Sequence, residues 1–222
     1  MNIRKLLLVL GSTAVLGAML AVVALAGRGA DEPPADITRI SQLIGGYGAT
    51  EAYRFEDLKT LSRAADLVIV ASVESAERFN EYGPPEGRIA TLEVMLRVSE
   101  VASDRQGTGV APGGLVRLEW WAGTPDVVAG AQAALSGVTA MWFLQSHETI
   151  RLRQGRSPEH AAEGANTYSI ISSQGLVVND RGKAVHAMMN RDEFASLVAE
   201  VERHSFRDLI TSVRQFADAR AD

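Results

Sequence analysis

Cysteine is absent from this chain of 222 residues. Without a thiol, the chain cannot form disulfides, use a thiolate nucleophile, bind zinc through sulfur or carry a lipid on cysteine. If the protein folds outside the cytoplasm, its hydrophobic core alone must therefore stabilise it.

Basic residues are outnumbered by acidic ones. Removing Arg4 and Lys5, which belong to an N-terminal apolar segment, leaves 20 basic against 27 acidic residues, a net charge of −7. Nucleic acids and anionic lipid surfaces attract basic patches, so we expect neither to bind this part of the chain.

Compact catalytic and metal-binding motifs are also missing. The chain contains no G-x-S-x-G nucleophile turn. Its glycine-rich stretches at 107–109 and 113–114 lack the strand-to-helix setting of a phosphate loop. Asp66 lies between a predicted helix and a predicted strand, where a turn role explains it better than catalysis.

The four histidines are scattered, and none has another histidine within five residues: His147, His160, His186 and His204. An H-E-x-x-H metal motif is therefore excluded. The pairs His147-Glu148 and Glu159-His160 lie in one polar stretch and could converge on a metal, although a solvated loop histidine is the commoner case. We predict no metal site, no cofactor and no identifiable catalytic residue.

The N-terminal segment carries a recognisable pattern, a basic start followed by a long apolar run. Arg4 and Lys5 precede an uncharged run from Leu6 to Ala26, which ends in the small-x-small triplet Ala24-Leu25-Ala26. This pattern is typical of a signal peptide cleaved after Ala26. The run has 21 residues, however, which is also long enough to span a membrane as an uncleaved anchor. Both interpretations place the remainder outside the cytoplasm.

The rest of the chain predicts one domain. Residues 1–26 are the signal peptide or membrane anchor, 27–36 contain glycine, proline and charge typical of a flexible tether, and 37–222 form a single extracytoplasmic domain. Apolar residues at spacings of three and four predict helices over 37–44 and 55–65.

Strands are predicted where apolar residues alternate or cluster as β-branched runs. These strands cover 67–71, 91–101, 115–121 and 138–144, followed by a pair at 167–172 and 176–179. Residues 147–164 are polar and are interpreted as a long excursion. Residues 180–183 form a turn into a further short extended segment at 184–185.

The C-terminal region returns to helical spacing. Asn190 and Glu193 form a capping-box pattern at the start of one helix. The spacing of apolar residues increases to five between Val201 and Phe206, which breaks the helical pattern. Ser205 is therefore predicted to cap a second helix. The fold class is therefore α+β, with a short helix, a small antiparallel β-barrel or curved sheet, and C-terminal helices.

Three segments carry a resemblance: 58–73, which includes Ala65-Asp66, then 91–94, and then 138–144, which ends in Phe143-Leu144. Together they resemble a loose group of uncharacterised exported bacterial proteins with a small OB-like or netrin-like β-barrel domain. This chain departs from the group in lacking cysteine and in lacking a lysine-glycine pair after the alternating strand, where it has Ser99 to Ala102. The resemblance implies an architecture and no activity.

Aromatic residues supply the candidate binding positions. Trp120 and Trp121 are adjacent in a predicted strand, so one ring should enter the core and the other should face outward. An outward tryptophan can serve as a stacking platform, although a neighbouring loop or helix more often covers it. Tyr82, near Pro84-Pro85, is a second candidate.

Three functions remain open. We expect a non-enzymatic module of the bacterial envelope that binds a protein or an envelope component. The first alternative is an envelope hydrolase whose active-site residues are scattered along the chain, which a polar site with histidines or carboxylates of shifted pKa would favour. The second alternative is an accessory subunit of a membrane complex, held through residues 6–26.

Overall fold

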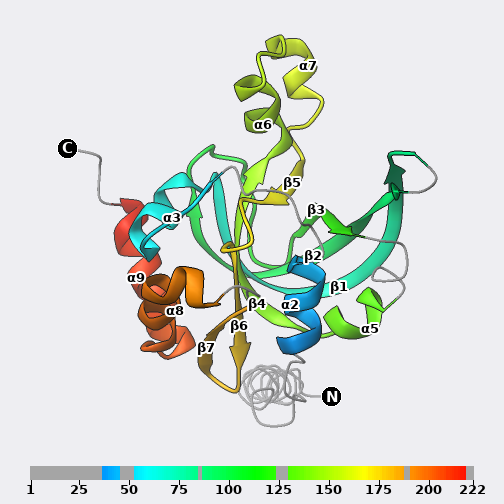
Figure 1. The fold of residues 1–222 in the computed structure, drawn as a ribbon. Coiled ribbons are helices and arrows are strands. Elements are labelled where there is room, and N and C mark those ends of the chain that lie inside the picture. The colour runs from blue at the N-terminus through cyan, green and yellow to red at the C-terminus, as the bar shows by residue number, and fades with distance from the viewer. Residues whose placement is uncertain (1–36, 46–52, 85–86, 124–129, 188–190, 219–222) are drawn as a thin grey trace, which may run out of the picture. The chain divides into compact units, whose positions relative to one another are not determined.

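The computed structural model describes residues 37–45, 53–84, 87–123, 130–187 and 191–218 (Figure 1). All of them belong to one compact unit, Ala35–Asp222. Residues 1–26 and 27–36, predicted to be a signal peptide or anchor and a tether, lie outside the described residues. Among the helices that are described, none has the length and apolar character needed to cross a membrane.

The elements follow one another in a mixed order. They are α2 (Ile37–Gly45), α3 (Leu58–Ala64), β1 (Leu67–Tyr82), β2 (Ile89–Asp104), β3 (Leu115–Gly123), α5 (Ala131–Leu135), β4 (Thr139–Ser146), α6 (His147–Arg153), α7 (Pro158–Ala162), β5 (Thr167–Ile170), β6 (Leu176–Asp180), β7 (Lys183–His186), the 3-10 helix η3 (Arg191–Phe194), α8 (Ala195–Glu202) and α9 (Phe206–Asp218). The expected α+β class is confirmed.

The first two helices lie where the helical spacing predicted them, with one change of boundary. α3 begins at Leu58 rather than Phe55, because the Asp57 carboxylate accepts a hydrogen bond from the Thr60 N–H at 2.7 Å and caps the helix. Phe55 precedes the cap. The buried side-chain amide of Gln174 accepts from the Phe55 N–H at 2.8 Å and donates to its carbonyl at 2.6 Å.

Seven strands of the described residues form one sheet, in the order β1-β2-β3-β5-β4-β6-β7, and β1 also pairs with β4. Every pair is antiparallel except β3–β5, which is parallel. Along one edge, β4 pairs with β1. Along its other edge, the first part of β4 pairs with β6 and the last part with β5.

The strand β1 is longer than its apolar pattern predicts. Its apolar run at 67–71 was predicted, but the strand continues to Tyr82 and has 16 residues, as β2 does. Most side chains in the distal half of β1 are polar, and only Ala76 is buried there, so this half carries little hydrophobic signal. The β1–β2 register shifts at four points, and such irregularities bend and twist a long hairpin.

Hydrophobic residues lie on both faces of β1 and β4. Leu67 and Ile69 pack with Trp142 in one cluster, which includes residues of α2 and α5. Val68 and Phe143 pack in a second cluster with residues of α3, α8 and α9. Figure 1 shows these three helices together on one side of the sheet. Burial on both faces explains why these strands read as continuous apolar runs.

The expected excursion at 147–164 contains two short helices, so its interpretation as a loop was incomplete. Ser146 caps α6 by accepting from the Thr149 N–H at 3.1 Å. Ser157 caps α7, whose first residue is Pro158. Serine caps and a proline at the first helical position stabilise helices too short to show an apolar stripe.

Strands form at both predicted positions, 167–172 and 176–179, as β5 and β6. β5 and β6 do not pair with each other, and each pairs with β4 instead. The turn after β6 is as predicted. Arg181 and Gly182 have φ of 52° and 85°, which suits a tight two-residue hairpin turn into β7.

The C-terminal region divides as predicted. The Ser205 hydroxyl accepts from the Asp208 N–H at 3.1 Å and caps α9. The preceding boundary differs, because a 3-10 helix over Arg191–Phe194 comes first and α8 begins at Ala195. The predicted cap at Asn190 lies outside the described residues.

Candidate functional site

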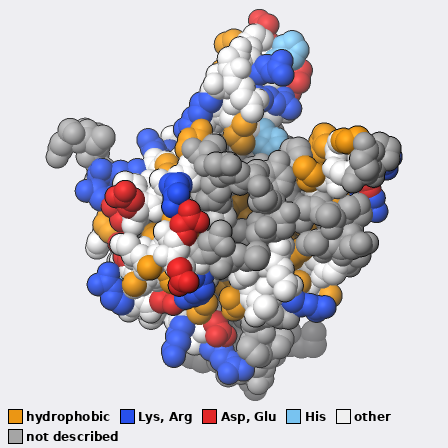
Figure 2. Space-filling view, in the orientation of Figure 1, with side chains coloured by type: hydrophobic (Ala, Val, Ile, Leu, Met, Phe, Trp, Pro, Cys, Tyr) orange, Lys and Arg blue, Asp and Glu red, His pale blue; other side chains and the backbone are white. Residues whose placement is uncertain are grey.

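Two long connections flank one part of the sheet. Figure 1 shows the far end of the β1–β2 hairpin and the α6–α7 segment projecting from the domain, with β3 and β5 between them. Figure 2 shows hydrophobic side chains grouped near the end of the hairpin, and acidic, basic and histidine side chains on the α6–α7 projection. The polar residues between the two projections form the candidate site.

Strand register brings two residues of the site together. Arg117 of β3 pairs with Thr167 of β5 in parallel, so two residues further along each strand Glu119 lies beside Ser169 on the same face. The Ser169 hydroxyl donates to the Glu119 backbone carbonyl at 3.2 Å.

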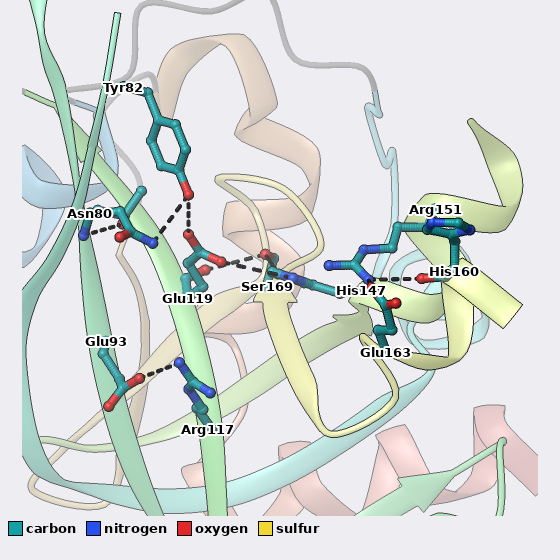
Figure 3. Close-up of polar contacts among 11 residues, drawn as sticks. Asn80, Tyr82, Glu93, Arg117, Glu119, His147, Arg151, His160, Glu163 and Ser169 are labelled. Atoms are coloured by element: carbon teal, nitrogen blue, oxygen red, sulfur yellow. Dashed lines mark hydrogen bonds and ion pairs between the residues drawn. The ribbon is translucent and has the colours of Figure 1, made fainter. Parts of the chain in front are cut away.

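The third residue comes from the end of β4. β4 pairs antiparallel with β5, with Ser146 opposite Tyr168, and His147 follows as the first residue of α6. Because Ser146 both ends the strand and caps the helix, the backbone turns there and directs the His147 side chain toward β5 (Figure 3).

The three side chains form one polar cluster, called here the 119/147/169 cluster. The Nε2 atom of His147 lies 2.8 Å from the Ser169 Oγ, and its Nδ1 atom lies 3.8 Å from the Glu119 Oε2 (Figure 3). The side chains of His147 and Glu119 are 17% and 14% exposed, so both are shielded but can be reached from solvent. Each ring nitrogen thus has its own neighbour.

The surroundings lower the pKa of His147 below its ordinary value. Burial is the main cause, and the nearby Glu119 carboxylate opposes it. The guanidinium groups of Arg151 and Arg117 add to the lowering because they repel a second positive charge. At neutral pH the imidazole is therefore uncharged and can accept a proton.

The hairpin contributes to the same site. The Tyr82 hydroxyl donates to the Glu119 Oε1 at 3.4 Å and accepts from the Asn80 side-chain amide at 3.2 Å (Figure 3). Tyr82 itself is 41% exposed. The ring of Phe79, also exposed, lies 5.1 Å from the guanidinium carbon of Arg117, a cation–π contact.

Arg117 also joins β3 to β2. Its guanidinium forms an ion pair with the Glu93 carboxylate at 2.6 Å (Figure 3). Acidic and basic groups are therefore matched across the face, and exposed aromatic rings lie beside them.

The binding residues predicted from the sequence fall in different places. Trp120 is buried, and its ring packs edge to face against Trp142 at 6.1 Å between centroids, so it belongs to the core. The backbone of Trp121 pairs with Thr91, while its side chain lies outside the described part of the structure. Tyr82 is the predicted residue that lies in the site.

His147 and His160 do not converge on one site. The His160 Nδ1 lies 3.2 Å from the Ser157 Oγ, and the His160 carbonyl accepts from Arg151, which also contacts Glu163 (Figure 3). Among the described residues there is no cluster of three or more side chains suited to holding a metal ion.

Gly164 allows the chain to pass close to His147. A Cβ atom at Gly164 would lie 2.7 Å from the His147 Cβ and 2.9 Å from its carbonyl carbon, closer than real contacts allow. A glycine is therefore required where the segment after α7 crosses the beginning of α6.

Sequence reasoning missed Glu119 and Ser169. Alternation in the predicted strand at 115–121 placed Glu119 on the face opposite Trp120, but nothing marked it as a partner of residues about 28 and 50 positions away. No known family, curated protein or solved structure matches this chain. The site must be interpreted from its own residues.

Proposed function

We propose that this protein is an exported or membrane-tethered envelope module that binds a protein or envelope component on the face between the β1–β2 hairpin and α6–α7. The observation that carries the proposal is the convergence of Tyr82, Glu119 and His147 from three separate elements at this face. Polar side chains brought together from distant parts of a chain, beside exposed aromatic rings, are typical of binding sites.

We further propose that five strands close into a small OB-like barrel. The pairs β1–β2, β2–β3, β3–β5, β5–β4 and β4–β1 lead from strand to strand and return to β1. Closure of this kind leaves no free edge among the five strands. OB-folds bind ligands on the face of strands 2 and 3, between the loops that follow strands 1 and 4. In this chain those positions are the end of the β1–β2 hairpin and the α6–α7 segment.

The chemistry of the face favours a ligand recognised by stacking and hydrogen bonds rather than by net charge. The charges of Arg117 and Glu93 compensate each other, and the Glu119 carboxylate faces His147 and the Tyr82 hydroxyl. Exposed aromatic rings at Phe79 and Tyr82 offer flat apolar surfaces beside these polar groups. The net negative charge of the exported part supports a partner other than nucleic acid.

Site-specific photocrosslinking in the living cell tests the proposal. A benzophenone amino acid would replace Phe79, and the same substitution at Thr211, exposed on α9, serves as the matched control. We expect a discrete crosslinked product from position 79 that Glu119→Ala weakens. Crosslinking from position 211 alone, or from neither position, would contradict the assignment of the binding face.

A further inference from the structure

We propose that the 119/147/169 cluster is a nucleophilic site that cleaves an ester of an exported or envelope-bound substrate, with Ser169 as nucleophile and His147 as general base. This activity goes beyond the proposed binding function and would act on an acyl group held at the same face. The proposal is carried by the arrangement of the three side chains around one imidazole.

The contacts follow the order that nucleophilic catalysis by serine requires. The nucleophile must contact one ring nitrogen and a carboxylate the other, so that the ring keeps its proton on the side away from the serine. Here Ser169 lies at Nε2, at 2.8 Å, and Glu119 lies at Nδ1, at 3.8 Å. The second distance is longer than a hydrogen bond, and such contacts often shorten only when substrate binds.

The single proton of the Ser169 hydroxyl has two acceptors within reach. One is the Glu119 backbone carbonyl at 3.2 Å, and the other is the His147 Nε2 at 2.8 Å. Rotation about the Cβ–Oγ bond moves the proton from the first to the second without moving the oxygen. The carbonyl contact therefore holds the Oγ atom in place beside the base.

The protonation state and nearby charges suit this chemistry. Burial keeps His147 uncharged at neutral pH, as a general base must be. Arg117 and Arg151 also lower the pKa of His147, so two guanidinium groups lie near the imidazole, each ion-paired with a carboxylate, Glu93 and Glu163 respectively.

The reaction balances without a cofactor. Ser169 Oγ forms a bond to the ester carbonyl carbon while its proton passes to His147 Nε2, and the alcohol leaves with that proton as the carbon–oxygen bond breaks. Water then attacks the acyl carbon, gives its proton to His147 and releases the acid. The Ser169 Oγ recovers the proton as its bond to the acyl carbon breaks.

A second serine–histidine contact in the same protein provides a matched control. Ser157 Oγ lies 3.2 Å from the His160 Nδ1, both residues are exposed, and no ion pair joins His160 to a carboxylate among the described residues. A fluorophosphonate probe, which forms an Oγ–phosphorus bond with loss of fluoride, should label Ser169 and leave Ser157 unlabelled.

The test uses the full-length protein, with labelled peptides identified by mass spectrometry and p-nitrophenyl acetate as turnover substrate. We expect Ser169→Ala to abolish labelling, and His147→Gln to slow it by about 100-fold or more. The labelling rate of the native protein should fall only at pH values below about 6.5, because the pKa of His147 lies below that of a free histidine.

Absence of labelling in the folded native protein would overturn the proposal, as would labelling that persists in Ser169→Ala. Thermal unfolding of each variant establishes that a loss of reactivity is not a loss of fold. The photocrosslinking experiment does not depend on a reactive serine, so failure here leaves the binding proposal to its own test.

Discussion

The Asp66 carboxylate accepts a hydrogen bond from the Ser146 N–H at 3.0 Å, joining the residue before β1 to the last residue of β4. The Ser146 hydroxyl lies 3.4 Å from the same oxygen. Since Ser146 precedes His147, this contact fixes the point at which the chain leaves the sheet and enters the site.

Replacing Asp66 with alanine should therefore weaken both the fold and the site. The Ser146 N–H would lose a charged acceptor, and we expect the free energy of unfolding to fall by about 1.5–3 kcal/mol. Chemical denaturation measures this change. The matched variant Asp192→Ala, at an exposed position in η3, should change it by no more than about 0.5 kcal/mol. Equal effects of the two substitutions would contradict the role given to Asp66.

Substitutions at Trp120 and Tyr82 should have different effects, the first on stability and the second on binding. Trp120 is buried against Trp142, so Trp120→Ala should cost about 3–5 kcal/mol of unfolding free energy. Tyr82 is exposed, and Tyr82→Ala should cost little stability while weakening the crosslink formed from position 79. Thermal melts and crosslinking yields measure the two effects. A stable Trp120→Ala variant that no longer crosslinks would show that Trp120 acts in binding instead.

Much of the fold could be predicted because its signals are local. The alternation at 91–101 indicates a strand with one buried face, and the apolar run at 138–144 indicates a strand buried on both faces. The change in apolar spacing between Val201 and Phe206 indicates that one helix ends and another begins. Each signal depends on neighbouring residues alone, so one sequence is sufficient to detect it.

The remaining features depend on contacts between distant residues. The distal half of β1 is held by pairing with β2, and most of its own side chains are polar. Ser169 and Glu119 become neighbours only through the parallel β3–β5 register, which no local pattern specifies. The two helices at 147–164 are too short for periodicity to show, although serine at 146 and the Ser157-Pro158 pair were visible as caps.

Gly164→Ala should displace His147. The added methyl group would meet the His147 Cβ at 2.7 Å, so either the segment after α7 or the start of α6 must move. We expect the imidazole NMR signals of His147 to shift and its contact with Ser169 to lengthen. Gly130→Ala is the matched control, because nothing lies within 4 Å of the position that its methyl group would occupy. Unchanged His147 signals in Gly164→Ala would contradict this account.

His186 should make stability depend on pH. Burial lowers its pKa to about 4, with the nearby Arg191 adding to the lowering, and the Gln174 backbone and Glu202 opposing it. Unfolding restores the ordinary value of 6.5, so the unfolded chain binds the proton more tightly. This contribution to stability is complete above pH 6.5 and is lost progressively down to pH 4, by about 3 kcal/mol in total.

His186→Phe should remove this part of the pH dependence, because the ring is kept and the titration is not. Denaturation at pH 4.5 and pH 7 compares the variant with the native protein, and His204→Gln serves as the control. A native-like difference between the two pH values in His186→Phe would assign the dependence to other groups.

Hydrogen exchange of the full-length protein tests the binding face most directly. Backbone amides would be followed with and without the solubilised envelope fraction of cells that produce the protein. We predict slower exchange in peptides covering the end of the β1–β2 hairpin and α6, and no change in α9. Protection confined to α9, or exchange that is identical in both samples, would contradict the account.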